Sequence, residues 1–145
     1  VPALEAAGST VGTGVDGSAR NDSSNLIEEL RHAFLLQRLN HGAEQISHHD
    51  ALRWATKGSA GCLGRTDIGT IAPGMQADLA MFRLDELRFS GAGDPLAALI
   101  LCGASRADRV MVQGQWRVEN GRIPTLDLDR LRAEHGAAAL ALTGG

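Results

Sequence analysis

The feature that most constrains the fold lies near the start of the chain. Residues 11–15 alternate β-branched residues with glycines, and this short β-forming run ends on one carboxylate, Asp16. A polar, Gly-rich loop follows, and the apolar spacing of a helix begins at Leu26. In α/β enzymes the carboxyl end of a strand holds catalytic groups at the site. We therefore predict a strand over Val11–Val15 that presents Asp16 at an open end.

The same run also has the spacing G-x-G-x-x-G, through Gly12, Gly14 and Gly17. A dinucleotide-binding fingerprint needs a strand before its first glycine and an apolar helix opening at its third. Only a few strand-forming residues precede Gly12, and the residues after Gly17 are polar. A dinucleotide-binding module remains an alternative on this pattern alone.

Composition limits the partners. The chain of 145 residues is long enough for a hydrophobic core, and its formal net charge is -3. It has no basic stripe and no apolar run of about 18 residues, so we expect neither nucleic acid nor a membrane as partner. Two isolated cysteines, Cys62 and Cys102, suit a reducing cytoplasm and are expected to be small buried hydrophobes. The opening Val1-Pro2 indicates the back part of a longer protein.

Apolar periodicity predicts two helices in the first part of the chain. The first covers 22–39, with N-cap candidates in Asp22–Asn25 and Gly42 as a left-handed cap at its end. The second follows a capping-box pattern at 47–50 and closes at Gly58 or Gly61.

From Ile68 the period changes from helical to strand-like. A strand is predicted over 77–82, and a hairpin over 110–118. We expect 68–82 and 109–123 to share one sheet. Asp94-Pro95 opens a short helix, and a closing amphipathic helix covers 127–142 with Leu128, Leu131 and Leu140 inward, followed by a frayed tail.

Three segments carry a resemblance to a known family. Residues 14–19, followed by Asn21-Asp22-Ser23, resemble the segment at the last barrel strand of the amidohydrolase superfamily, in its nucleobase and triazine deaminase branch. Residues 67–74 with 77–79 resemble that family's re-entry into its small β-sandwich, and 109–116 are similar to the sandwich's closing strands.

The resemblance implies an α/β fold class: the last strand and helices of a metal-dependent (β/α)8 barrel plus part of a small β-sandwich. We expect the last barrel β-α element with an extra helix in 1–63, the sandwich portion with a short helix at 94–102 in 64–125, and the C-terminal helix and tail in 126–145. The partners implied are the missing N-terminal part of the same protein, a nucleobase substrate and further copies in a homo-oligomer.

The resemblance also implies the chemistry. The expected reaction is hydrolytic deamination of an oxidised purine, 8-oxoguanine, to urate and ammonia; guanine, another aminopurine or a triazine remain alternative substrates. The implied cofactor is a divalent metal, zinc, which lowers the pKa of a bound water to roughly 7. Asp16 matches the family position that binds the metal and moves the proton, and Asn21 and Asp22 are candidates for substrate contact.

One departure from the family is clear. The five histidines, His32, His41, His48, His49 and His135, include no H-x-H pair, so each is interpreted as a solvated or capping residue. The remaining metal ligands are expected outside this chain, and the segment alone should be inactive. A metal-free relative acting as a scaffold stays open. Asp78 is expected to fix backbone, and Trp54 and Trp116 to pack in a core or interface.

Overall fold

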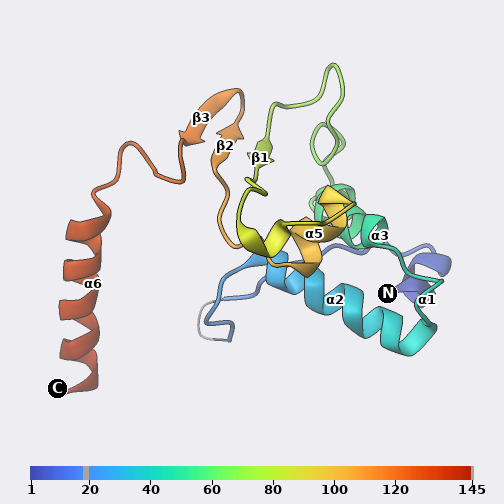
Figure 1. Ribbon diagram of the computed structural model, residues 1–145, viewed down its shortest axis with the longest axis horizontal. Coiled ribbons are helices and arrows are strands. Elements are labelled where there is room, and N and C mark those ends of the chain that lie inside the picture. The colour runs from blue at the N-terminus through green and yellow to red at the C-terminus, as the bar shows by residue number, and fades with distance from the viewer. Residues whose placement is uncertain (18–19, 145) are drawn as a thin grey trace.

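The computed structural model describes residues 1–17 and 20–144. Helices gather at one end of the chain's main body, a small sheet lies beside them, and the C-terminal helix stands apart (Figure 1). The helices are α1 (Pro2–Ala6), α2 (Leu26–His41), α3 (His48–Arg53), a π-helix (Trp54–Gly58), α4 (Ser59–Cys62), a 3-10 helix (Leu87–Phe89), α5 (Pro95–Leu101) and α6 (Leu128–Thr143). The strands are β1 (Leu79–Met81), β2 (Arg109–Val112) and β3 (Gln115–Val118).

The core lies where α2, α3, the π-helix and α5 meet. Its largest fully buried side chains are Trp54, Phe34, Leu30 and Ile100. Burying an apolar side chain of this size contributes about 1.5–3 kcal/mol. The packing of Ile100 against residues of α2 and α3 joins the second half of the chain to the first.

The first long helix is confirmed, with a later start than predicted. The Asn25 side chain caps α2 by accepting the Ile27 N–H at 3.0 Å, so Asp22 lies before the helix. Two acidic residues occupy the first turn, where the helix dipole favours them. The left-handed cap predicted at Gly42 is wrong: its φ of 92° is positive, but its ψ is 152°.

The second helix begins as predicted and runs further. Ser47 and Asp50 form the capping box at the start of α3. The helix does not close at Gly58 or Gly61, because it widens into the π-helix and continues through α4 to Cys62. A π-turn inside a helix often occurs at a functional site.

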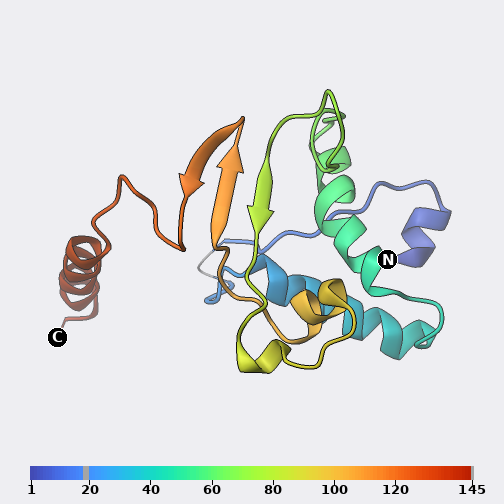
Figure 2. The same cartoon turned by 45° about the horizontal axis from the view of Figure 1, so that its top comes forward.

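The shared sheet is confirmed, although its strands are shorter than predicted. Antiparallel β1 and β2 pair Leu79 with Met111, and β2 pairs with β3 through the tight turn after Val112 (Figure 2). The sheet order is β1-β2-β3. Asp78 fixes backbone as expected, since its Oδ1 accepts the N–H of Gln113 in the hairpin turn at 2.7 Å. Residues before Leu79, from 68 to 78, form turns and loop.

The short helix behind Asp94-Pro95 is confirmed as α5. Asp127 caps α6, but the predicted inward face is wrong: α6 buries none of its residues, and Leu131 and Leu140 are exposed. Thr143 is still helical, and Gly145 lies outside the described residues.

The prediction for the two cysteines is also corrected. Cys62 is exposed and Cys102 is half-buried, so neither is a fully buried hydrophobe. Trp54 packs in the core as predicted, whereas Trp116 on the edge strand β3 is 38% exposed and its packing in an interface stays a prediction. Among the described residues, none of the helices is both long and apolar enough to cross a membrane.

Candidate functional site

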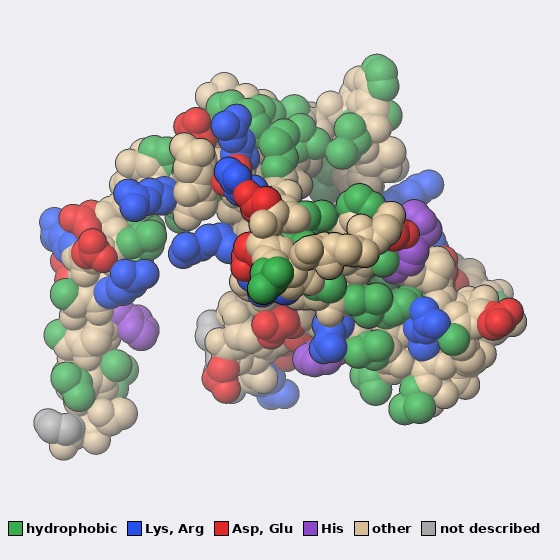
Figure 3. Space-filling view, in the orientation of Figure 1, with side chains coloured by type: hydrophobic (Ala, Val, Ile, Leu, Met, Phe, Trp, Pro, Cys, Tyr) green, Lys and Arg blue, Asp and Glu red, His purple; other side chains and the backbone are tan. Residues whose placement is uncertain are grey.

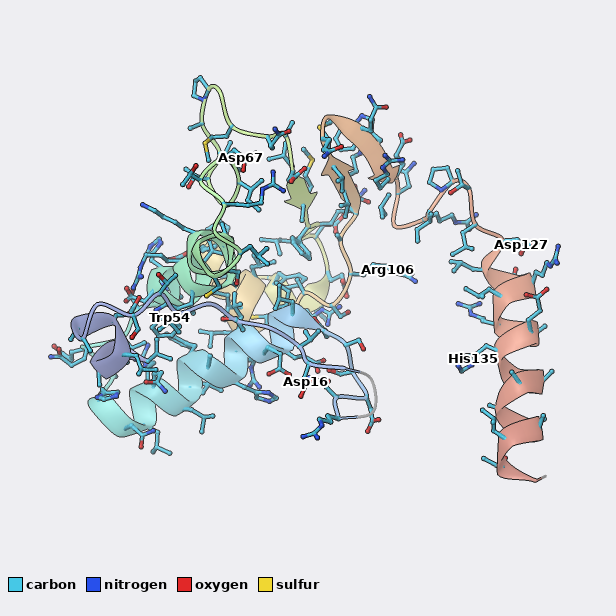
Figure 4. All side chains as sticks on the ribbon, turned by 180° about the vertical axis from the view of Figure 1, so that it is seen from behind. Asp16, Trp54, Asp67, Arg106, Asp127 and His135 are labelled. Carbon is cyan, nitrogen blue, oxygen red and sulfur yellow. The ribbon has the colours of Figure 1, made fainter. Side chains whose placement is uncertain are left out.

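The predicted catalytic carboxylate, Asp16, lies on an exposed loop near the first turn of α2 (Figure 4). Its φ of 61° is in the left-handed region, which is uncommon outside glycine and often marks functional positions. The backbone N–H of Gly17 donates to Asp16 Oδ1 at 2.7 Å. This hydrogen bond orients the carboxylate, while Oδ2 makes no hydrogen bond within the described part of the chain.

The strand predicted over Val11–Val15 is wrong for this chain. A strand forms only where its backbone hydrogen bonds are paired with those of a neighbouring strand. The described residues place no second strand beside this segment, and its backbone is irregular. Its anchoring comes from Ser59 instead. The N–H of Thr13 donates to Ser59 Oγ at 3.1 Å. The single proton of that hydroxyl has two possible acceptors, the carbonyls of Thr13 and Trp54, each at 3.1 Å.

Glycines allow the segment before Asp16 to lie directly on the π-helix and α4. A Cβ at Gly12 would come within 2.7 Å of Ser59 Cα, and one at Gly58 within 2.1 Å of the Val11 carbonyl oxygen. A Cβ at Gly61 would meet the Thr10 methyl group at 2.8 Å. The absence of a Cβ at these glycines therefore lets the segment before Asp16 pack closely against the π-helix and α4.

This packing also removes the basis for the dinucleotide alternative. Gly12 touches α4, Gly14 and Gly17 have open space around them, and the next helix starts only at Leu26. A pyrophosphate site would need a helix N-terminus immediately behind the third glycine. Ser59, which holds the segment, was missed in the sequence, although the small-residue run 58–61 is typical of close approach.

The two predicted substrate-contact residues lie in the loop that follows Asp16. The N–H of Asn21 donates to the Gly17 carbonyl at 3.1 Å, which brings Asn21 back toward Asp16. Asn21 Nδ2 donates to Glu29 of α2 at 2.6 Å, and its Oδ1 accepts hydrogen bonds from Ser23 and Ser24. Asn21 thus holds the loop against α2, whereas Asp22 is exposed.

A cleft of about 720 Å³ begins beside this loop. Its walls come from the start of α2, from the α3 and π-helix segment, and from β1 and α5; they include Ser24, Leu26, Ala55, Phe82 and Leu99. The lining is mostly apolar, which is typical of ligand pockets and of buried interfaces between elements. Hydrophobic side chains are also exposed over the strands and along the helical end (Figure 3).

The described residues contain one group of three metal-ligating side chains, and it does not include Asp16. The group is formed by His48, His49 and Asp94. The two histidines begin α3 as predicted, but their interpretation as simple capping or solvated residues missed Asp94, which comes from α5.

Comparisons with known proteins agree on one family. The profile described as "Amidohydrolase family" matches residues 1–117. The chain is 64% identical over 142 residues to the 8-oxoguanine deaminase of Pseudomonas aeruginosa, covering 98% of this chain and 32% of that protein. It is 40% identical over 150 residues to hydroxydechloroatrazine ethylaminohydrolase of a Pseudomonas species, covering 99% of this chain and 31% of that protein.

Among solved structures, the chain is similar to atrazine chlorohydrolase TrzN from Arthrobacter aurescens TC1 in complex with zinc. The TM-score is 0.84 at 44% sequence identity, over 92% of this chain and 30% of that one. The chain spans about a third of the length of the relatives it matches. The predicted α/β fold class, as a piece of an amidohydrolase barrel protein, is confirmed by these likenesses.

Proposed function

Because the chain belongs to the amidohydrolase family, we propose that the protein containing it is a metal-dependent hydrolytic deaminase of 8-oxoguanine. The reaction adds water to the purine carbon that bears the exocyclic amine and releases ammonia, leaving urate. The observation that carries the proposal is the 64% identity to an 8-oxoguanine deaminase over 98% of the chain.

In this proposal Asp16 binds the metal and moves the proton. A carboxylate oxygen is a good zinc ligand, and Asp16 is exposed with Oδ1 oriented by the Gly17 N–H. When bound, the metal supplies a water of lowered pKa. Asp16 would take a proton from that water and later deliver it to the leaving amine, a type of catalysis worth on the order of 10²–10⁴ in rate.

The rest of the site is proposed to lie outside this chain. The relatives are about three times as long as the segment they share with it, so other ligands and most substrate contacts have room there. The zinc complex of the similar atrazine chlorohydrolase supports zinc as the metal in this proposal. The domain boundaries, the homo-oligomer, the cytoplasmic location and contact of Asn21 or Asp22 with substrate remain predictions.

A triazine is the second candidate substrate. Two relatives support it, since the chain is 40% identical to hydroxydechloroatrazine ethylaminohydrolase and 44% identical to atrazine chlorohydrolase. Because these identities are lower than the 64% identity to the 8-oxoguanine deaminase, a triazine is the less favoured substrate. Comparing kcat/KM for 8-oxoguanine, guanine and hydroxyatrazine on one enzyme preparation separates these substrates.

The mechanistic test is Asp16→Asn in the full-length protein. The amide still fills the position but cannot carry a proton at neutral pH, so kcat and kcat/KM for ammonia release should fall together, by at least about 10². The control is Glu44→Gln, which alters an exposed carboxylate that has no proposed role in the site. Turnover by Asp16→Asn close to that of wild type would contradict the role of Asp16, and active enzyme free of metal would favour a metal-independent relative.

A further inference from the structure

The group formed by His48, His49 and Asp94 joins two helices that are far apart in the sequence. His48 and His49 are the first residues of α3, and Asp94 is the N-cap of α5. One ligand atom from each of the three side chains lies within 4.8 Å of the others. Histidine surface is visible on the outside of the molecule in the region of α3 (Figure 3).

The closest contact in this group is not a direct hydrogen bond. His48 Nε2 lies 2.9 Å from Asp94 Oδ2, yet within the described chain this buried nitrogen has no hydrogen-bond partner, so the carboxylate lies off the axis of the ring nitrogen. A buried polar atom left unpaired is destabilising. A cation between the nitrogen and the carboxylate would satisfy both groups.

Asp94 is oriented for such a role. Its Oδ1 accepts the backbone N–H groups of Leu96 and Ala97 at 2.9 and 3.1 Å. This capping fixes the carboxylate plane and leaves Oδ2 directed toward His48. Oδ1 therefore caps α5 while Oδ2 faces His48, so binding an ion through Oδ2 would leave the cap of α5 in place.

The two histidines converge although they are consecutive. Neighbouring residues of an α-helix normally point about 100° apart, but these ring centroids are 4.3 Å from each other. Tetrahedral zinc with ligand bonds of 2.0–2.1 Å separates its ligand atoms by about 3.4 Å. The spacings found here, 2.9 Å at the closest contact and within 4.8 Å overall, bracket that value.

We propose that His48, His49 and Asp94 bind a divalent transition-metal ion of the zinc class, with water completing its coordination. Two imidazoles and one carboxylate form a donor set that suits zinc better than magnesium or calcium, which prefer oxygen ligands. The bound ion would tie the start of α3 to the start of α5. The site does not involve Asp16, and it stands whether or not the proposed deaminase activity is correct.

The test counts metal equivalents. Full-length protein is stripped with a chelator, dialysed to equilibrium against zinc, and its zinc content is measured by mass spectrometry. Wild type should retain one more equivalent than His49→Ala or Asp94→Asn. His49 is exposed, and asparagine can still cap α5, so neither change threatens the fold. The matched control is His32→Ala, which removes an exposed histidine of α2 and should retain the wild-type number.

Cobalt gives a second readout that does not depend on activity. Loading the stripped protein with cobalt should produce a visible absorption band. In His49→Ala and Asp94→Asn the intensity of this band should fall by the contribution of one bound cobalt ion. The same zinc content and the same cobalt spectrum in wild type, His49→Ala and Asp94→Asn would overturn the proposal. A loss of melting temperature in these variants that is unaffected by zinc would also overturn it, because the cluster would then act only as an ion pair.

Discussion

At the scale of single residues, Gly58 sets how closely the segment before Asp16 approaches the π-helix. In Gly58→Ala the new Cβ would lie 2.1 Å from the Val11 carbonyl oxygen, so the backbone must move. Overpacking of this kind costs about 1–3 kcal/mol. We expect a lower melting temperature and a reduced kcat/KM, because the displaced segment carries Asp16.

The matched control for this change is Gly14→Ala in the same segment. Gly14 has open space where a Cβ would go, and it is not among the residues with positive φ. Melting by calorimetry and ammonia release, measured on both variants in the full-length protein, check the expectation. An equal effect of the two substitutions would show that close packing at Gly58 is not what holds the segment.

At the scale of elements, the capping box of α3 makes stability depend on pH. Hydrogen bonds from the Ser47 side chain and backbone hold the pKa of Asp50 below its ordinary value. The ionised carboxylate therefore stabilises the fold above its unfolded pKa of about 3.9, and this contribution is lost as the pH falls through the lower folded pKa.

We predict that Asp50→Ala lowers the stability of the full-length protein by about 0.5–2 kcal/mol near pH 7, as the loss of a helix cap does. The difference from wild type should shrink below about pH 4 and vanish once Asp50 is protonated in the folded wild type. Thermal melts between pH 2.5 and 7 measure this. The exposed carboxylate of Glu44 supplies the control, Glu44→Gln; a difference between Asp50→Ala and wild type that stays constant at low pH would refute the assignment.

Elements with their own start and stop signals could be predicted from sequence. The capping box of α3, the Asp94-Pro95 start of α5 and the hairpin turn after Val112 all formed as expected. The strand over 11–15 and the inward face of α6 were predicted wrongly. A strand needs a neighbouring strand and an inward face needs a surface to pack on, and the described chain provides neither for these two segments.

The candidate site divides in the same way. Asp16 could be proposed from the sequence because its signal is local, a β-forming run that ends on a carboxylate, and its role stays a prediction. The contact between His48 and Asp94 could not be predicted from the sequence, since it joins residues of two helices that only tertiary packing brings together. The anchoring of the 11–13 segment by Ser59 was missed for the same reason.

At the scale of the whole molecule, much apolar surface is left uncovered. Leu39, Ile71 and Leu87 are each more than 80% exposed, and α6 buries none of its residues. Large apolar side chains exposed in this number are typical of a surface that another part of a protein covers. In the proposed enzyme the remaining two thirds of the protein would cover part of it.

We therefore expect residues 1–145 expressed alone to bind the dye ANS, to associate at micromolar concentration and to melt without a cooperative transition. Calorimetry, ANS fluorescence and light scattering check this, with the full-length protein as the control. A monomeric segment with a sharp calorimetric melt and no ANS binding would contradict it.

The central claim is that this chain supplies a metal ligand to a hydrolytic centre, and anomalous diffraction from crystals of the full-length protein tests it most directly. Data collected on both sides of the zinc absorption edge locate zinc independently of any assumption about the fold. The account predicts an anomalous peak about 2.0–2.2 Å from a carboxylate oxygen of Asp16. A catalytic metal whose ligands do not include Asp16, or no anomalous peak near Asp16 in active protein, would contradict it.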